Sequence, residues 1–227
     1  MSSVMKINGG TKIDCTGADR VTRSLLGYGV LAGPVYVVAA LVQGMARPGF
    51  DLLHDDVSLL SNGNLGWIQI ANFILTGVFV IAAAAGMARA LNGRSTWGPR
   101  LLAVFGAGLI AAGIFVADPM NGFPVGTPAG HPVSVSWHGM LHIAAAGIGF
   151  LCLVAACIVL ARMFGREGRR SWMAYSLVTG VVFLLAFAGV ASGSTSAAVV
   201  IGFWVGVVIA FSWIAAVSID LYRKQSA

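Results

Sequence analysis

Charged residues are scarce in this chain. Asp, Glu, Lys and Arg make up 10% of its 227 residues, whereas soluble domains average about 25%. Hydrophobic residues make up 58%, and the mean hydropathy is +0.86. So little charge in a chain of this length excludes an ordinary soluble domain and is typical of an integral membrane protein.

Cysteine is scarce as well. Cys15 lies in a polar N-terminal stretch, while Cys152 and Cys157 lie in the middle of an apolar one, so no disulfide framework is expected. The chain also lacks a basic patch, because its net charge of +6 is spread between apolar stretches. This distribution is explained by the positive-inside rule and gives no reason to expect nucleic-acid binding.

Two further patterns are absent. The first twenty residues are polar and unlike the short basic start of a secretory signal, so we expect the first apolar span to be retained. The two halves of the chain show no clear internal repeat, so a transporter-type duplication is not invoked.

Long apolar stretches are what the sequence does contain. Each is long enough to cross a hydrocarbon core about 30 Å thick. The predicted spans are 24–45, 67–90, 101–117, 138–163, 172–191 and 197–221. We therefore predict an all-α membrane protein, a six-transmembrane-helix bundle over residues 24–222, between a polar tail (1–23) and a short C-terminal tail (223–227).

The basic residues predict the orientation. An even number of spans places both termini on one side of the membrane, and the basic residues of that side are Lys6, Lys12, Arg20, Arg23, Arg89, Arg94, Arg100, Arg162, Arg166, Arg169, Arg170, Arg223 and Lys224. Arg47 stands alone on the other side. We expect both termini in the cytoplasm and a multi-pass protein of the bacterial plasma membrane.

Small residues recur at a spacing of four in two of the predicted spans. Gly29 and Gly33 form one such pair, and Gly202 and Gly206 form another. Such pairs let helices approach closely, so they predict tight packing in the bundle and provide faces for oligomerisation. Between the first two spans, Leu53, Val57 and Leu60 share one helical face, which predicts a short amphipathic helix lying in the membrane interface.

The predicted topology brings all four histidines to the outer side. His138 and His142 are four residues apart, so on a helix they project from one face, one turn apart. Polar groups near the apolar region usually mark a functional site. The predicted catalytic residues are Asp118, His138, His142 and Ser58; the predicted metal ligands are His138, His142 and His54; and the predicted supporting residues are Asp55, Ser136 and Trp137.

Structural interpretations compete with these roles. Asp118 ends an apolar span, where a carboxylate often caps loop amides. His138 and His142 are also explained by hydrogen bonds to a neighbouring helix. Loop histidines and aspartates such as His54 and Asp55 are common on the outer side, and Trp137 is typical of an interface anchor.

Three motifs resemble a known family. They are Asp-Pro-x-x-Gly-Phe-Pro-x-Gly-Thr-Pro over 118–128, Ser-Trp-His-Gly-x-Leu-His over 136–142, and Ser-x-Leu-Ser-x-x-x-x-Gly-Trp over 58–67. With them the chain resembles the bacterial six-helix proteins of domain-of-unknown-function family 998. The resemblance implies a fold and a membrane location, but it implies no activity.

The leading functional hypothesis is hydrolysis of a lipid-like substrate at the outer leaflet. His138 and His142 have the spacing of a two-histidine zinc site, with a third ligand from His54, Asp118 or Asp55 and an activated water. Gly139 stands where a zinc protease of the His-Glu-x-x-His type carries its glutamate, so that signature is incomplete.

Other functions compete with hydrolysis. One is a non-enzymatic lipid-binding, sensing or assembly protein, with histidines that titrate near neutral pH. Another is an acid-initiated isoprenoid (terpene) cyclase, with Asp118 as the acid and the rings of Phe115, Phe123 and Trp137 facing the cation. A b-type haem would need a loop histidine as second axial ligand. The expected partners are membrane lipids or a lipophilic small molecule.

Overall fold

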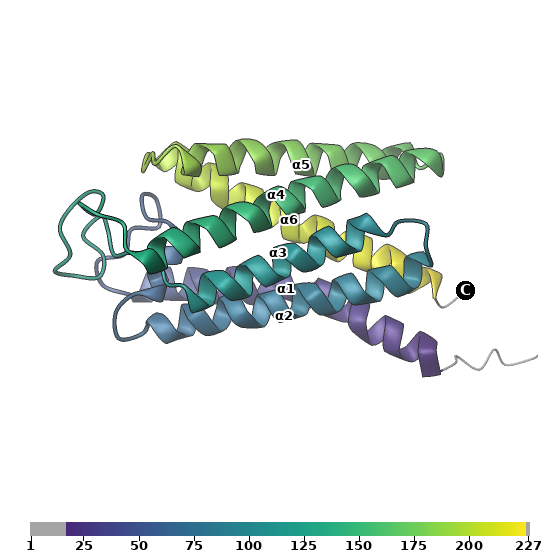
Figure 1. The fold of residues 1–227 in the computed structure, drawn as a ribbon, viewed down its shortest axis with the longest axis horizontal. Helices are drawn as coiled ribbons and strands as arrows, with labels where there is room; N and C mark the ends of the chain where they lie inside the picture. The colour runs from purple at the N-terminus through teal and green to yellow at the C-terminus, as the bar shows by residue number, and fades with distance from the viewer. Residues whose placement is uncertain (1–16, 226–227) are drawn as a thin grey trace, which may run out of the picture.

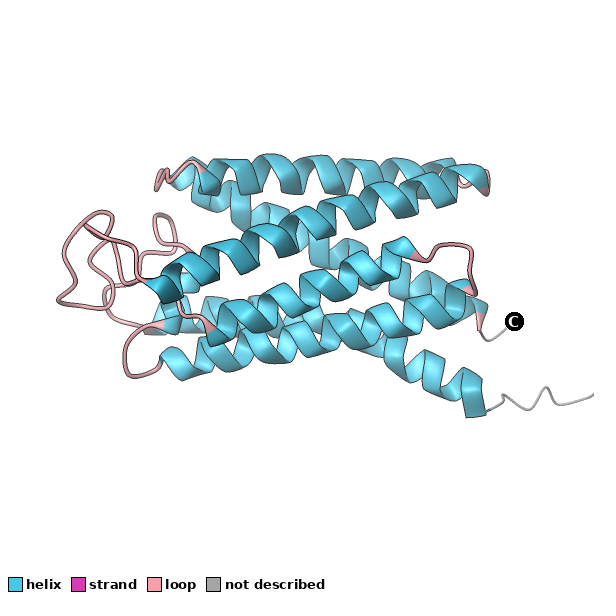
Figure 2. Cartoon of the chain, in the orientation of Figure 1, coloured by secondary structure: helices cyan, strands magenta, loops and turns pink. Residues whose placement is uncertain are grey.

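The computed structural model describes residues 17–225, and these form six long helices with no strand among them (Figures 1 and 2). The helices are α1 (Gly17–Ala46), α2 (Gly66–Leu91), α3 (Trp97–Ile114), α4 (Trp137–Arg166), α5 (Arg170–Ala191) and α6 (Ala197–Lys224), with a short 3-10 helix, η1 (Val57–Ser61), between α1 and α2. All six long helices have the length and hydropathy needed to cross a membrane, as predicted.

The helices form a closed ring. Each packs against the next in chain order, and α6 packs against α1 to complete the ring. Both described ends of the chain lie at one end of the bundle, and the connections α1–α2, α3–α4 and α5–α6 lie at the other (Figure 1). We call these the terminal end and the loop end. That the terminal end faces the cytoplasm remains a prediction, supported by its basic residues.

Close contact between α1 and α6 depends on the first glycine pair. A Cβ on Gly33 would lie 2.7 Å from the Cβ of Phe211, and one on Gly29 would overlap the hydroxyl of Ser218. The second pair behaves differently. Gly206 faces Ala186 at a comparable 2.8 Å, whereas nothing lies within 4 Å of a Cβ built on Gly202. The glycine pattern therefore predicts one helix contact completely and the other in part.

Large side chains fill the terminal half of the ring. Trp213, Phe164, Met87 and Leu160 are fully buried there. The indole Nε1 of Trp213 donates a hydrogen bond of 2.9 Å to the hydroxyl of Ser176, which joins α6 to α5. The interior of this half is therefore packed.

The structure corrects three local predictions. Helix α1 begins at Gly17, about two turns before the predicted start at Ser24, and the remainder of the predicted tail, residues 1–16, lies outside the described residues. Helix α3 ends at Ile114, three residues before the predicted end of this span at residue 117. The predicted interface helix is instead η1, whose Val57 and Leu60 are buried against α1 and α2 while Leu53 stays exposed. Sequence amphipathicity here reflects packing under a loop.

Candidate functional site

Arg47 contacts both large segments of the loop end, the α1–α2 connection and the α3–α4 connection. Its guanidinium donates hydrogen bonds to the backbone carbonyls of Leu60 and Asn62, at the end of η1. The same group lies 4.8 Å from the centre of the ring of Phe123, a buried residue of the α3–α4 connection. Arg47 is buried, and burial lowers the pKa of its guanidinium. Arg47 is the only Lys or Arg that the described residues place at this end, and its contacts give it a structural role.

Asp118 lies at the N-terminus of α4. Its Oδ2 accepts a hydrogen bond of 2.8 Å from the backbone amide of Ser136, and the Ser136 hydroxyl accepts one of 3.0 Å from the amide of Gly139. A Cβ on Gly139 would overlap the Asp118 carboxylate, so glycine is what allows this approach. Carboxylates are stabilised at helix N-termini by free amides and the helix dipole. The capping interpretation of Asp118 thus has direct geometric support.

His142 is oriented by the end of α3. Its Nδ1 lies 3.0 Å from the carbonyl oxygen of Ala112 and 2.8 Å from that of Phe115. Carbonyl oxygens only accept hydrogen bonds, so Nδ1 carries the proton and the neutral ring keeps a lone pair on Nε2. The end of α3 frees these carbonyls, because the last turn of a helix has no backbone donors for its own.

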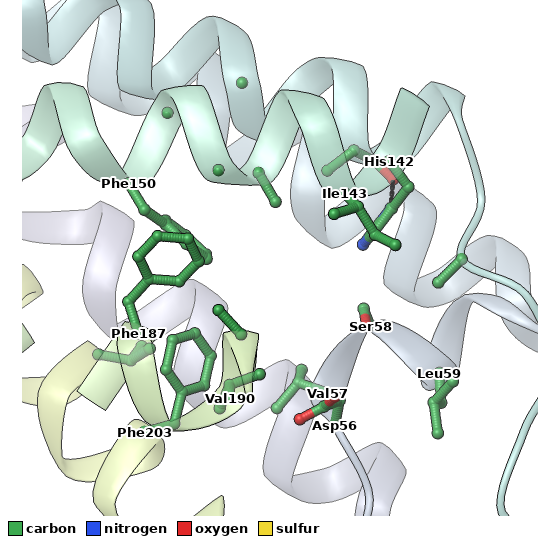
Figure 3. A pocket seen from close by; sticks show the side chains of 18 of the residues that line it. Asp56, Val57, Ser58, Leu59, His142, Ile143, Phe150, Phe187, Val190 and Phe203 are labelled. Carbon is green, nitrogen blue, oxygen red and sulfur yellow. Dashed lines mark hydrogen bonds between the residues drawn. The ribbon is translucent and has the colours of Figure 1, made fainter. Parts of the chain in front are cut away.

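A cavity of about 570 Å³ lies inside the loop half of the ring. Its lining comes from all six helices, from η1 and from the connections around it. Aromatic rings line its inner part: Phe150, Phe183, Phe187 and Phe203 (Figure 3). Phe150 is eight residues beyond His142 on α4, so the cavity extends about 12 Å along the helix.

The other end of the cavity is polar. The side chains of Asp56, Ser58 and His142 surround it (Figure 3). Figure 3 shows a ring nitrogen of His142 directed toward Ser58 across the cavity. Asp118 and Tyr36 also contribute to the lining.

Several of these polar groups have no partner in the protein. Within residues 17–225, no hydrogen bond forms to the Asp56 carboxylate, the Ser58 hydroxyl or the Tyr36 hydroxyl. The pKa of Asp56 is raised to about 6, mainly by burial and also by the neighbouring Asp55 carboxylate, while His131 opposes the shift. Buried polar groups are normally satisfied. The cavity therefore offers unused acceptors to a bound molecule.

Of the predicted catalytic residues, the structure brings Asp118, His142 and Ser58 to one cavity and leaves His138 out of its lining. The ring of His138 stacks on that of Trp137, with 3.5 Å between ring centres, and also contacts Phe115. Although His138 and His142 lie one helical turn apart, only His142 lines the cavity, and His138 packs beside it.

The other predicted residues support the loops. His54 is exposed, and its Nδ1 pairs with the carboxylate of Asp51 at 2.8 Å. Asp55 is buried and accepts a hydrogen bond from the Asp51 amide, and burial raises the pKa of its carboxyl. Ser136 caps α4, and Trp137 is exposed.

The described residues contain no ready-made metal site. Among residues 17–225, no three His, Cys, Asp or Glu side chains gather closely enough to hold one ion. His54 pairs with Asp51 instead, and His138 packs on Trp137. The donor set predicted for zinc does not fit this geometry, so zinc chemistry has no preformed ligand group here.

Sequence reasoning gave too little weight to Asp56 and to His131. Asp56 precedes η1 and lines the cavity, but in the sequence it is only one of several aspartates in an outer loop. His131 also lines the cavity, and its Nε2 donates to the carbonyl of Gly193 at 3.1 Å, linking the α3–α4 connection to the α5–α6 turn. The cavity aromatics carry no sequence signal beyond hydrophobicity.

Together, the fold and the cavity define a multi-pass membrane protein whose six helices enclose an interior site at one end. A family model described as "Protein of unknown function (DUF998)" matches residues 30–220, and the chain belongs to this family. The match confirms the resemblance seen in the three sequence motifs. No curated protein matches the chain, and no solved structure matches it.

Proposed function

We propose that this protein binds an amphipathic, lipid-like molecule in the cavity at its loop end, on the outer side of a bacterial plasma membrane. The observation that carries the proposal is the change in lining along one cavity. Aromatic rings line the inner part, and Asp56, Ser58 and His142 line the part near the loops. The apolar part of the molecule would contact the rings, and its polar group would meet the three polar side chains.

The size and position of the cavity agree with this function. Pockets for small molecules typically measure about 300–1,000 Å³ and combine an apolar lining with a few oriented polar groups. This cavity, at about 570 Å³, falls inside that range. The lining includes Ile143 and Ala191, which are both exposed, and we propose that a molecule enters from the lipid phase beside them.

A substitution on α4 tests binding. Ala146 lines the cavity one turn beyond His142, so Ala146→Phe should fill part of it. Ala144 is exposed on the same helix and does not line the cavity, which makes Ala144→Phe a matched control. The full chain is purified in detergent, and co-purifying lipophilic molecules are counted per protein by mass spectrometry.

We expect a bound molecule in the wild type and in Ala144→Phe, and its loss in Ala146→Phe. Equal amounts in both variants would contradict binding in this cavity. Unfolding curves of both variants show whether the fold is retained.

The orientation of His142 favours one chemical role beyond binding, a hydrolytic one that needs no metal. Its Nδ1 is fixed by two carbonyls, which leaves Nε2 available as a base on the ring edge that Figure 3 shows facing Ser58, whose hydroxyl forms no hydrogen bond within the described residues. In acyl transfer, Ser58 Oγ would bond to the acyl carbon while Nε2 takes the hydroxyl proton and passes it to the leaving group. Water would then release the acyl group from Ser58 by the reverse path.

A fluorophosphonate probe tests this role, because it labels activated serines. We expect labelling of the wild type, none of Ser58→Ala, and at least tenfold slower labelling of His142→Ala. Ser194→Ala is the control, since Ser194 lines the same cavity and bonds to Ser196. Unlabelled wild type, or labelled Ser58→Ala, would leave the protein as a binding protein only.

A further inference from the structure

We infer that the cavity selects lipophilic amines, with the Asp56 carboxylate as counter-ion of the bound ammonium group. This inference rests on the proposed binding function and names the class of molecule bound. It follows from an inventory of the charges and hydrogen-bonding groups that the cavity presents.

The polar end of the cavity is rich in acceptors. The Asp56 carboxylate only accepts hydrogen bonds when ionised, and the neutral His142 ring offers Nε2 as an acceptor because Nδ1 already donates. The hydroxyls of Ser58 and Tyr36 can accept as well. A primary ammonium group brings three donors and no acceptor, so it matches this set.

No Lys or Arg among the described residues pairs with the Asp56 carboxylate. Lys and Arg are absent from the cavity lining. Arg47 is the only Lys or Arg in the described part of the loop end, and it contacts the carbonyls of Leu60 and Asn62 and the ring of Phe123. Asp118, the second carboxylate of the lining, accepts from the Ser136 amide. A partly buried carboxylate without a partner is costly, and a bound cation removes that cost.

The same inventory argues against anionic head groups. A phosphate or carboxylate in this cavity would meet Asp56 and Asp118 with no Lys or Arg to pair with. The titratable groups that face Asp56 are Asp55, His131 and Tyr36. Of these, only His131 is a basic residue, and its Nε2 is engaged by the Gly193 carbonyl.

Three probes that share one hexadecyl chain test the inference: hexadecylamine, hexadecanol and hexadecyl phosphate. Binding of each probe to the full-length protein in a non-ionic detergent at pH 7.5 is measured by native mass spectrometry. We expect the affinity to decrease from the amine to the alcohol to the phosphate. The amine should bind about tenfold more tightly than the alcohol, which is the gain in affinity expected from one charge-assisted hydrogen bond.

Asp56→Asn should weaken amine binding about tenfold and leave alcohol binding unchanged. Asp51→Asn is the matched control, because it removes the same charge from an exposed position of the same connection. Asp56→Glu should retain the preference for the amine. The Asp56 carboxylate makes no hydrogen bond within the described residues, so Asp56→Asn breaks none.

The outcomes separate the two proposals. Equal binding of amine and phosphate, or equal losses in Asp56→Asn and Asp51→Asn, would overturn the amine selectivity while leaving lipid binding intact. Failure of all three probes to bind the wild type would overturn the binding function itself. The ranking of probes on the wild type stands even where a variant fails to fold.

Discussion

Replacing Gly139 by alanine tests how α4 begins. A Cβ on Gly139 would lie 2.7 Å from Cγ of Asp118, closer than real Cβ contacts come. The carboxylate would have to move away and give up its bond to the Ser136 amide. Crowding costs about 1–3 kcal/mol, and the lost hydrogen bond costs about 1 kcal/mol. The better helix propensity of alanine returns at most about 1 kcal/mol. We expect a net loss of about 2 kcal/mol.

The assay is reversible unfolding of the purified protein in mixed micelles, followed by circular dichroism. Gly202→Ala is the control, since nothing lies within 4 Å of its added Cβ, and it should leave stability unchanged or slightly raised. A second test combines Gly139→Ala with Asp118→Ala. Without the carboxylate the added methyl group has room, so the two losses should not add. Full additivity, or a Gly139→Ala protein as stable as the wild type, would refute the reasoning.

Two further predictions concern the loop end. Arg47→Met should lower the free energy of unfolding by about 2 kcal/mol, because two buried carbonyls lose their donor; Arg100→Met, a change at the terminal end, should cost less than half of that in the same unfolding assay. For Asp56, burial raises the pKa in the folded protein to about 6, above its ordinary 3.8, so the folded state gains from protonation. That contribution to stability is full below pH 4 and is lost as pH rises through about 6. Unfolding curves measured across this range should therefore show the wild type losing stability relative to Asp56→Asn. Parallel pH profiles of the two proteins would contradict the burial of the carboxyl.

The six helices could be predicted because their signal is local. Length and apolarity of a stretch suffice to assign a membrane span, whatever it packs against. The boundaries needed more. Residues 17–23 contain Arg20 and Asp19, which ended the apolar pattern, yet the helix continues through them beyond the apolar region. The segment around Val57 shows helical spacing, but a single 3-10 turn under a loop satisfies it.

The site could be predicted only in part, because it depends on which way each side chain faces. His138 and His142 share a motif and a predicted face, but only His142 reaches the carbonyls where α3 ends. The end of α3 is a tertiary feature that no spacing encodes. Asp55 and Asp56 are adjacent and chemically identical, yet one is bound by a backbone amide and the other lines the cavity. No pattern in the sequence distinguishes the two.

The packed terminal half of the ring limits how a guest can move. Trp213 is fully buried there and tied to Ser176, and Met87 and Phe164 fill the space around it. A molecule that left the cavity toward the terminal end would have to displace these packed side chains. The packed half closes the proposed binding cavity toward the terminal end, an arrangement that suits retention or chemical conversion of a molecule better than its translocation.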